Sequence, residues 1–442
     1  MKCFKVLIIC LTLSSCSFDN KTGIWKNEKN DIDDESNIFK EFKTVTTFEN
    51  KFNKIIPFDN KNKFQLLKPI NNLEWNDEFF GLNNNLKNFQ YDDLNKIILK
   101  SKKLSNNKVF ERILFANNHL IINDEKGNII IYSISRKKTI YKFNFYKKKY
   151  KKIKKKLNLI IENDIIYVSD NIGYLYSFNY KHNKLVWAKN YKIPFRSNLK
   201  IFNNKIIVSN QNNNLFFLDK INGDLIKFIP TEETIVKNNF INNLSIDDKN
   251  NLFFLNTYGS LYSIDAKNMK INWFLNLNQS TDVNPSNLFK SVQIVSNENK
   301  VLIGSNNKTF IIDKNSGFIE NKFIFAPLIK PIINKTYAFL ITENNYLISI
   351  DLSTNKILYS SYINQEIANF LNVNKKNVEI QSFMLLSNKI TIFLKNSFVL
   401  NFNSIGKLQS VKKLPSQLSS IPIIINKLLY FLDKKNRLVI LS

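Results

Sequence analysis

Two stretches of this sequence decide its fold: Gly173-Tyr-Leu-Tyr-Ser-Phe-Asn179, followed by Trp187, and Gly259-Ser-Leu-Tyr-Ser-Ile-Asp265, followed by Trp273. In both, a turn residue opens an apolar strand that ends on a small polar residue. The tryptophan follows at the same distance from the glycine in each stretch. The same unit recurs from about residue 118 onward. Aligned on this strand, the eight copies are residues 127–133, 173–179, 213–219, 259–265, 307–313, 345–351, 397–403 and 436–442.

The residue types and the spacing of these copies predict the blades of a β-propeller. Most copies open with Gly or Asn, which tolerate the left-handed backbone of a tight hairpin. A second turn position, further along each unit, holds Asn183, Gly223, Gly317 and Asn355. The copies recur at intervals of roughly 40–50 residues, which is enough for about four strands each. We therefore expect an all-β fold, an eight-bladed propeller of four-stranded antiparallel blades.

An aromatic residue recurs at a constant offset from the opening turn residue, as Tyr141, Trp187, Trp273 and Tyr359. An aromatic at a fixed offset in a repeat is typical of packing between neighbouring units. The alternative is a ring that stacks on a ligand. We expect these four residues to be structural.

The chain ends at Ser442, directly after the aligned strand of the eighth copy. The last blade would then lack its outer strand, and an open strand edge is a liability. We expect a strand from the region Phe64 to Trp75 to complete this blade and close the ring.

The N-terminus has the pattern of an exported lipoprotein. Lys2 and Lys5 precede a short apolar run, residues 6–13, which is too short to span a membrane. The run ends in Leu13-Ser14-Ser15-Cys16, which resembles the bacterial lipobox, in which the cysteine receives lipid after cleavage. A generic cleavable signal is the alternative. We expect residues 1–15 to be a signal peptide, Cys16 to carry acyl chains such as palmitate, residues 16–60 to be a flexible tether, and residues 61–442 to be the propeller.

Composition excludes several classes of function. The chain has a formal charge of +28, but only four of its 64 basic residues are arginine. Nucleic-acid readers depend on arginine, and the abundance of lysine with asparagine, isoleucine and phenylalanine is typical of an AT-rich genome. Two histidines, and three cysteines that all lie between Cys3 and Cys16, leave few metal ligands or nucleophiles. We therefore predict no catalytic residues, no metal, no cofactor and no nucleic-acid partner.

The Gly-x-Leu-Tyr-x-apolar-Asp strand and its tryptophan resemble the repeat of quinoprotein-type eight-bladed propellers. With the lipobox and a single propeller, the chain resembles the BamB family, lipoproteins of the outer-membrane β-barrel assembly machinery. That resemblance implies a non-enzymatic scaffold in the outer membrane that faces the periplasm. It would dock on a BamA-like barrel-inserting subunit, beside other subunits of the complex, and assist the delivery of unfolded outer-membrane proteins.

The same resemblance implies a docking loop that contains an arginine. Here that loop is Pro194-Phe195-Arg196, and Arg196 is one of only four arginines. An ordinary surface arginine is the alternative interpretation. The family's acidic pair should fall near residues 240–242, where this sequence has Phe-Ile-Asn.

Two other functions remain open at this point. A quinone-dependent dehydrogenase shares the repeat, but its resemblance implies a calcium site and usually adjacent cysteines. In residues 147–156, eight of ten residues are lysine, around Tyr150 and Ile153. This run either binds anionic lipid head groups or is a solvated charged edge.

Overall fold

A computed structural model describes residues 52–59, 64–234, 239–278, 288–305 and 307–442. It also describes two short strands, β1 (Cys16–Phe18) and β2 (Trp25–Asn27), which pair antiparallel. The chain divides into two units, Met1–Asn50 and Lys51–Ser442, and each is described by itself. The predicted signal peptide, most of the predicted tether and the side chain of Cys16 lie outside the described residues.

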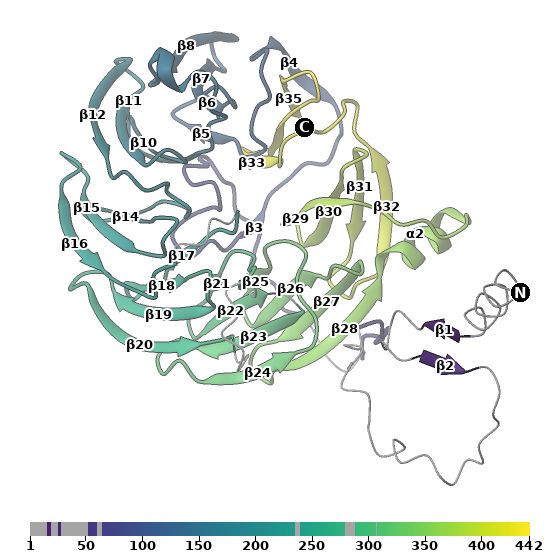
Figure 1. Cartoon of the computed structure of the whole chain (residues 1–442). Helices are drawn as coiled ribbons and strands as arrows, with labels where there is room; N and C mark the ends of the chain where they lie inside the picture. Colours follow the sequence, from purple (N-terminus) through teal and green to yellow (C-terminus); the bar gives the residue numbers. More distant parts are fainter. Residues whose placement is uncertain are drawn as a thin grey trace, which may run out of the picture. The chain divides into compact units, whose positions relative to one another are not determined.

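In the second unit, the described residues form eight antiparallel sheets arranged as the blades of a ring (Figure 1). Blades 1 and 2 are β5 (Leu114–Ala116), β6 (His119–Asn123), β7 (Asn128–Ser133) and β8 (Lys138–Asn144), then β9 (Leu157–Glu162), β10 (Ile165–Asp170), β11 (Tyr174–Asn179) and β12 (Lys184–Asn190). Blades 3 and 4 are β13 (Lys200–Phe202), β14 (Lys205–Ser209), β15 (Leu215–Asp219) and β16 (Leu225–Ile229), then β17 (Asn243–Ile246), β18 (Asn251–Leu255), β19 (Ser260–Asp265) and β20 (Lys270–Asn276).

The other four blades continue around the ring in chain order. Blades 5 and 6 are β21 (Val295–Ser296), β22 (Lys300–Ser305), β23 (Lys308–Asp313) and β24 (Ile319–Phe323), then β25 (Ile332–Asn334), β26 (Tyr337–Ile341), β27 (Tyr346–Asp351) and β28 (Lys356–Tyr362). Blades 7 and 8 are β29 (Ile380–Leu386), β30 (Lys389–Leu394), β31 (Phe398–Phe402) and β32 (Leu408–Lys413), then β33 (Ile423–Ile425), β34 (Leu428–Leu432), β35 (Arg437–Leu441) and β4 (Ile97–Lys103). The predicted eight-bladed propeller is confirmed.

The repeated strand of the sequence is the third strand of each blade, counted from the ring axis. The turn residues that open it have positive φ at Gly127, Gly173, Asn213, Gly259, Asn345, Ser397 and Asn436. The second turn position is also left-handed at Asn183, Gly223, Gly317 and Asn355. These residue types therefore mark the hairpins because their backbone conformation is costly for most other residues.

The ring is closed by β4, which pairs antiparallel with β35 and supplies the outer strand of blade 8. The prediction that Phe64 to Trp75 supply this strand was wrong. Trp75 instead pairs with Phe115 of the innermost strand of blade 1. The closing strand lies just ahead of blade 1 because an outer strand must lead into the next blade through a short connection, here residues 104–113.

Residues 64–89, which we call the axial segment, contact the inner strands of all eight blades. Its partners, in blade order, include Phe115, Ile161, Lys200, Leu244, Ser296, Ile333, Leu385 and Ile424. The segment also includes β3 (Asn88–Phe89), which adds a fifth, parallel strand to blade 7. It therefore satisfies main-chain groups that the innermost strands would otherwise leave unpaired.

Three of the four recurring aromatics lie between neighbouring blades. The indole Nε1 of Trp187 donates to the carbonyl of Lys220 in blade 3 at 3.1 Å, and that of Trp273 donates to Lys314 in blade 5 at 3.0 Å. The two rings lie directly over Gly223 and Gly317, where an added Cβ would come within 2.8 Å of the ring. Tyr359 is fully buried over Gly406 of blade 7, and Tyr141 is half-buried against the main core cluster.

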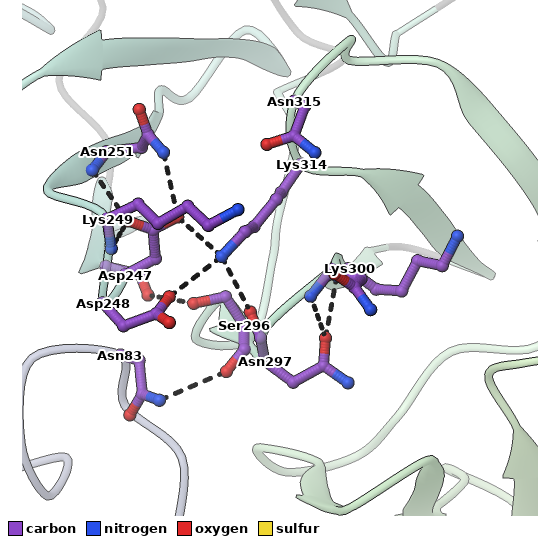
Figure 2. A network of polar contacts seen from close by, with 12 residues as sticks. Asn83, Asp247, Asp248, Lys249, Asn251, Ser296, Asn297, Lys300, Lys314 and Asn315 are labelled. Atoms are coloured by element: carbon purple, nitrogen blue, oxygen red, sulfur yellow. Dashed lines mark hydrogen bonds and ion pairs between the residues drawn. The ribbon is translucent and has the colours of Figure 1, made fainter.

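Apolar clusters of described residues fill the interfaces between blades 2 to 6, and some buried charge lies among them. Lys314 of blade 5 has a fully buried side chain that points at two carboxylates of blade 4 (Figure 2). Its ammonium lies 3.0 Å from Asp247 and 2.9 Å from Asp248, and it also donates to the carbonyl of Asn297. The interface between blades 4 and 5 therefore combines apolar packing with an ion pair.

Two features were not predicted from the sequence. Helix α2 (Ile363–Leu371) is inserted between blades 6 and 7 and accounts for the longest spacing between copies. Phe52, within the predicted tether, packs on Phe325 and Tyr346 of the propeller. Ile56 exchanges two main-chain hydrogen bonds with Ser360 of β28 at 2.9 and 3.0 Å. The chain thus contacts the propeller before residue 61.

Candidate functional site: the connection face and its axial cavity

The propeller has two faces, and the connections between blades lie on only one of them. In a four-stranded antiparallel blade, the turn between the second and third strands lies at the same end as the connection to the next blade. The main-chain N–H of Gln211 in such a turn donates to the carbonyl of Pro194 in such a connection at 2.7 Å. We call this end of the ring the connection face, and the end with the other turns the opposite face.

An axial cavity of about 250 Å³ lies among these connections. The axial segment contributes Trp75, Glu78 and Phe79, and the inter-blade connections contribute Arg112 and Lys330. The volume is below the roughly 300–1,000 Å³ of most small-molecule sites. The axial segment therefore leaves only a small space at the centre of the ring.

The charges at this cavity influence one another. Burial raises the pKa of Glu78 to about 7, and the Arg112 guanidinium opposes this rise. The carboxylate of Glu78 accepts the main-chain N–H of Leu159 at 2.9 Å. Lys330 donates to the carbonyl of Phe79, and burial and then Arg112 lower its pKa well below the usual value. Arg112 itself stacks on the ring of Phe79, with its Cζ 4.1 Å from the ring centroid.

A second buried lysine ties the axial segment to blade 3. The ammonium of Lys200 lies 2.6 Å from the carboxylate of Asp77 and donates to the carbonyl of Gly81 at 2.6 Å. Burial lowers the pKa of Lys200, and Asp77 opposes that shift. The pair fixes the segment next to Glu78 and so helps to hold the cavity in shape.

The donor set of the cavity does not fit a calcium ion beside a quinone. Calcium takes six to eight oxygen ligands, several of them usually carboxylates. Two carboxyls, Glu78 and Glu111, line the cavity beside the basic groups of Arg112 and Lys330, and its other side-chain oxygens are the neutral ones of Ser291, Gln293, Gln381 and Ser382. Glu78 is also partly protonated near neutral pH. Within the described ranges, no three His, Cys, Asp or Glu side chains form a metal-binding group.

The predicted docking loop lies on the connection face between blades 2 and 3, but much of it is buried. Phe195 is 2% exposed and packs edge-on against Tyr191. Arg196 is half-buried, and its Nη2 donates to Gln211 at 3.3 Å. Burial lowers its pKa, and its Nε has no hydrogen-bond partner among the described residues. Pro194 is half-buried as well. The surface that this loop offers is therefore small, and Phe195 contributes none of it.

Of residues 240–242, where an acidic pair was expected, Ile241 is exposed and Asn242 has a structural role. Asn242 is buried, and its amide donates to the hydroxyl of Ser209 and to the carbonyl of Asn210, both at 2.9 Å. Its main-chain N–H donates to the carbonyl of Arg196 at 2.8 Å. Asn242 therefore stabilises the Arg196 loop from the inside.

Sequence reasoning missed the axial cavity altogether. Glu78, Arg112 and Lys330 come from three distant segments outside the repeat alignment. One usable signal was Arg112, one of the four arginines in a lysine-rich chain. Another was the run Asn83-Asn84-Asn85, whose amides bond to main-chain groups of blades 4, 5 and 6.

Comparison with known proteins identifies structures that share this fold. No family model and no curated protein matches the sequence. The crystal structure of BamB from Moraxella catarrhalis matches with a TM-score of 0.60 over 78% of this chain and 98% of that chain, at 11% identity. This chain has the propeller fold of BamB.

The same fold is found in proteins with other roles. Quinohemoprotein alcohol dehydrogenase from Comamonas testosteroni matches with a TM-score of 0.60 at 10% identity, over 81% of this chain and 76% of that chain. The computationally designed Ika8 protein matches with a TM-score of 0.59, also at 10% identity, over 78% of this chain and 99% of that chain. These likenesses establish the architecture, and function has to be argued from the residues.

Proposed function

We propose that this protein is a non-enzymatic scaffold lipoprotein of the outer-membrane β-barrel assembly machinery. It would dock on the barrel-inserting subunit, face the periplasm and assist the delivery of unfolded outer-membrane proteins. The observation that carries the proposal is the match to BamB, which spans 98% of that chain with a single propeller. The lipobox-like Leu13-Ser14-Ser15-Cys16 adds a means of attachment to the membrane.

The residues around the ring axis favour a scaffold function and argue against a quinone-dependent enzyme. The axial segment occupies the centre of the ring, and the remaining cavity has a donor set unsuited to calcium. Binding would then use the connections and turns at the ends of the ring. Among the described residues, none of the helices has the length and apolar character needed to cross a bilayer. Anchoring in this proposal depends on lipid at Cys16.

Docking would use the connection face near the Arg196 loop. Asn242 holds the main chain of Arg196, and the partly exposed guanidinium is oriented by one hydrogen bond that it donates to Gln211. A guanidinium held in place binds a carboxylate in a defined geometry. The partner would therefore present an acidic side chain to this loop.

Isolation of native complexes tests the proposal. The protein is immunoprecipitated from detergent-solubilised membranes after cross-linking in cells, and its partners are identified by mass spectrometry. We expect the barrel-inserting subunit among them. Recovery without any barrel-assembly subunit contradicts the proposal, and recovery with a quinone and calcium favours the dehydrogenase.

The Arg196 loop is tested separately with Arg196→Glu. We expect this variant to recover at least about tenfold less barrel-inserting subunit, because a like charge would face the partner's acid. Arg136→Glu, an exposed arginine on the opposite face, is the matched control. Thermal unfolding of both variants shows whether the fold is retained. Equal recovery with folded Arg196→Glu would remove the loop from the interface.

A further inference from the structure

A basic hollow of about 440 Å³ lies on the connection face between blades 1 and 2. It is separate from the axial cavity and from the Arg196 loop. Five of its seven lining residues are lysine; the seven are Lys126, Asn144, Tyr146, Lys147, Lys148, Lys151 and Lys155. The connection that forms most of it contains the short 3-10 helix η1 (Lys148–Tyr150). Four lysines of the run at residues 147–156 thus line the hollow.

The base of the hollow is built from fixed groups. Tyr146 lies against Gly127, where φ is +82° and a side chain would clash with its ring. The Tyr146 hydroxyl donates to the carboxylate of Asp170 at 2.7 Å. Lys155 is 2% exposed, donates to the carbonyl of Tyr150 and lies 5.0 Å from the Tyr146 ring centroid. The hollow therefore has a rigid floor.

The rim is held to this floor by Asn144. Its amide donates to the carbonyl of Lys126 at 3.1 Å, and its side-chain oxygen accepts the main-chain N–H of Tyr146 at 2.8 Å. On the other side, the main-chain N–H of Lys151 donates to the carbonyl of Lys148 at 3.0 Å. Lysines from two separate loops are thereby brought around one space.

Ion pairs within the described residues do not neutralise the positive charge of the hollow. Among the described residues, no carboxylate forms an ion pair with any of the five lysine ammonium groups that line it. Nearby Glu125 pairs with Lys154, which does not line the hollow, at 3.7 Å. Asp170 accepts from Tyr146 and from three main-chain N–H groups at 2.8–2.9 Å. Burial, and then the charge of Lys126, lower the pKa of Lys155, and the charge of Asp170 opposes this shift.

We propose that the basic hollow binds a phosphate-bearing ligand with at least two negative charges. Lysine ammonium groups act as point charges that suit phosphate oxygens. The volume of about 440 Å³ is within the roughly 300–1,000 Å³ of sites for small organic ligands and exceeds what a bare ion needs. The phosphate could belong to the head group of an anionic lipid or to a soluble phosphorylated compound, and the two sources share this chemistry.

Binding is measured on the full chain carrying Cys16→Ser, so that no acyl anchor contributes. One arm titrates pyrophosphate and glycerol 3-phosphate by calorimetry. The other arm measures flotation with vesicles of phosphatidylcholine that contain about one-fifth phosphatidic acid, against vesicles of phosphatidylcholine alone. Binding in either arm supports the hollow as a phosphate site. Flotation without soluble binding identifies a lipid head group, and soluble binding without flotation identifies a free ligand.

The test variant carries Lys126→Gln, Lys147→Gln, Lys148→Gln and Lys151→Gln, four exposed positions that line the hollow. The matched control carries four Lys→Gln changes on the opposite face, at Lys184, Lys270, Lys356 and Lys389, which are exposed as well. We expect the test variant to bind at least about tenfold more weakly and the control to stay within about twofold of the parent chain. Absence of binding by the parent chain, or an equal loss in the control, overturns the proposal.

Discussion

The lysines of the basic hollow and the lysines buried between blades carry the same charge in opposite surroundings. Lys200 and Lys314 have no exposed side-chain surface, and each meets at least one carboxylate within 3.0 Å. The hollow gathers five lysines without a carboxylate at ion-pair distance among the described residues. At Lys200 and Lys314 the fold supplies this counter-charge, because an unpaired buried charge is costly. Four of the five lysines of the hollow are exposed, and in our proposal a ligand supplies their counter-charge.

The largest effect should come from Lys200→Met, which leaves Asp77 buried without its partner. Loss of one member of a buried pair costs about 3–5 kcal/mol in the free energy of unfolding. Urea denaturation measures the change, and Lys205→Met, in the same blade but without a carboxylate partner among the described residues, is the control. The double variant Lys200→Met with Asp77→Leu should regain part of the loss. A single-variant cost below about 1 kcal/mol would contradict the structural role of this pair.

A smaller and graded effect is expected at the pair of blades shown in Figure 2. Lys314→Met should cost about 2–4 kcal/mol, because Asp247 is 1% exposed and would lose its counter-charge. Asp248→Asn should cost less than about 0.5 kcal/mol, since Asp248 is 63% exposed. Chemical denaturation of the two variants gives both values. Equal costs at the two positions would mean that burial does not set the strength of these contacts.

Glu78 gives a third test, through pH. Its pKa is about 7 in the folded chain and 4.5 in the unfolded chain, so the folded state keeps a proton between these values that the unfolded state has released. Stability should therefore fall as pH rises from about 4.5 to about 7, by at most about 2 kcal/mol once the partial exposure of Glu78 is allowed for. The Glu78→Gln variant should not show this fall in stability with rising pH. Identical pH profiles of unfolding for the variant and the parent chain would contradict the burial of this carboxyl.

The smallest effect on stability is expected at the basic hollow. The four Lys→Gln changes at its rim should alter the free energy of unfolding by less than about 0.5 kcal/mol, because they remove no ion pair seen in the described residues. Because the changes relieve charge repulsion around Lys155, they could raise the free energy of unfolding slightly. Thermal unfolding of this variant and of the opposite-face control measures the difference. A loss above about 2 kcal/mol in the free energy of unfolding would show that these lysines stabilise the fold, as Lys200 and Lys314 do.

The repeat made the fold predictable, since one hairpin recurs eight times and needs the same residues each time. Gly173 and Gly259 have positive φ, and Trp187 and Trp273 reach the next blade, as their types and spacing suggested. Residues outside the repeat were not predictable in this way. The closing strand Ile97–Lys103 has no copy to align with, and its place depends on a partner strand at the far end of the sequence, Arg437–Leu441.

The candidate site was harder to predict because it is assembled from unrelated segments. Glu78 and Arg112 become neighbours because the axial segment pairs with blade 1 at Trp75 and Phe115, and burial raises the pKa of Glu78. The docking loop was chosen for Arg196, but a sequence does not reveal that Phe195 is buried. The lysine run was visible, whereas the contribution of Lys126 from another hairpin was not.

Site-specific photo-cross-linking tests the proposed docking function most directly. A photo-reactive residue is placed at Lys192, exposed beside the Arg196 loop on the connection face, or at Asn222, exposed in a turn of the opposite face. Cells that carry each variant are irradiated, and cross-linked proteins are identified by mass spectrometry. We predict that the barrel-inserting subunit is captured from Lys192 and not from Asn222. If the barrel-inserting subunit is captured from neither position, or from Asn222 alone, docking through the connection face is contradicted.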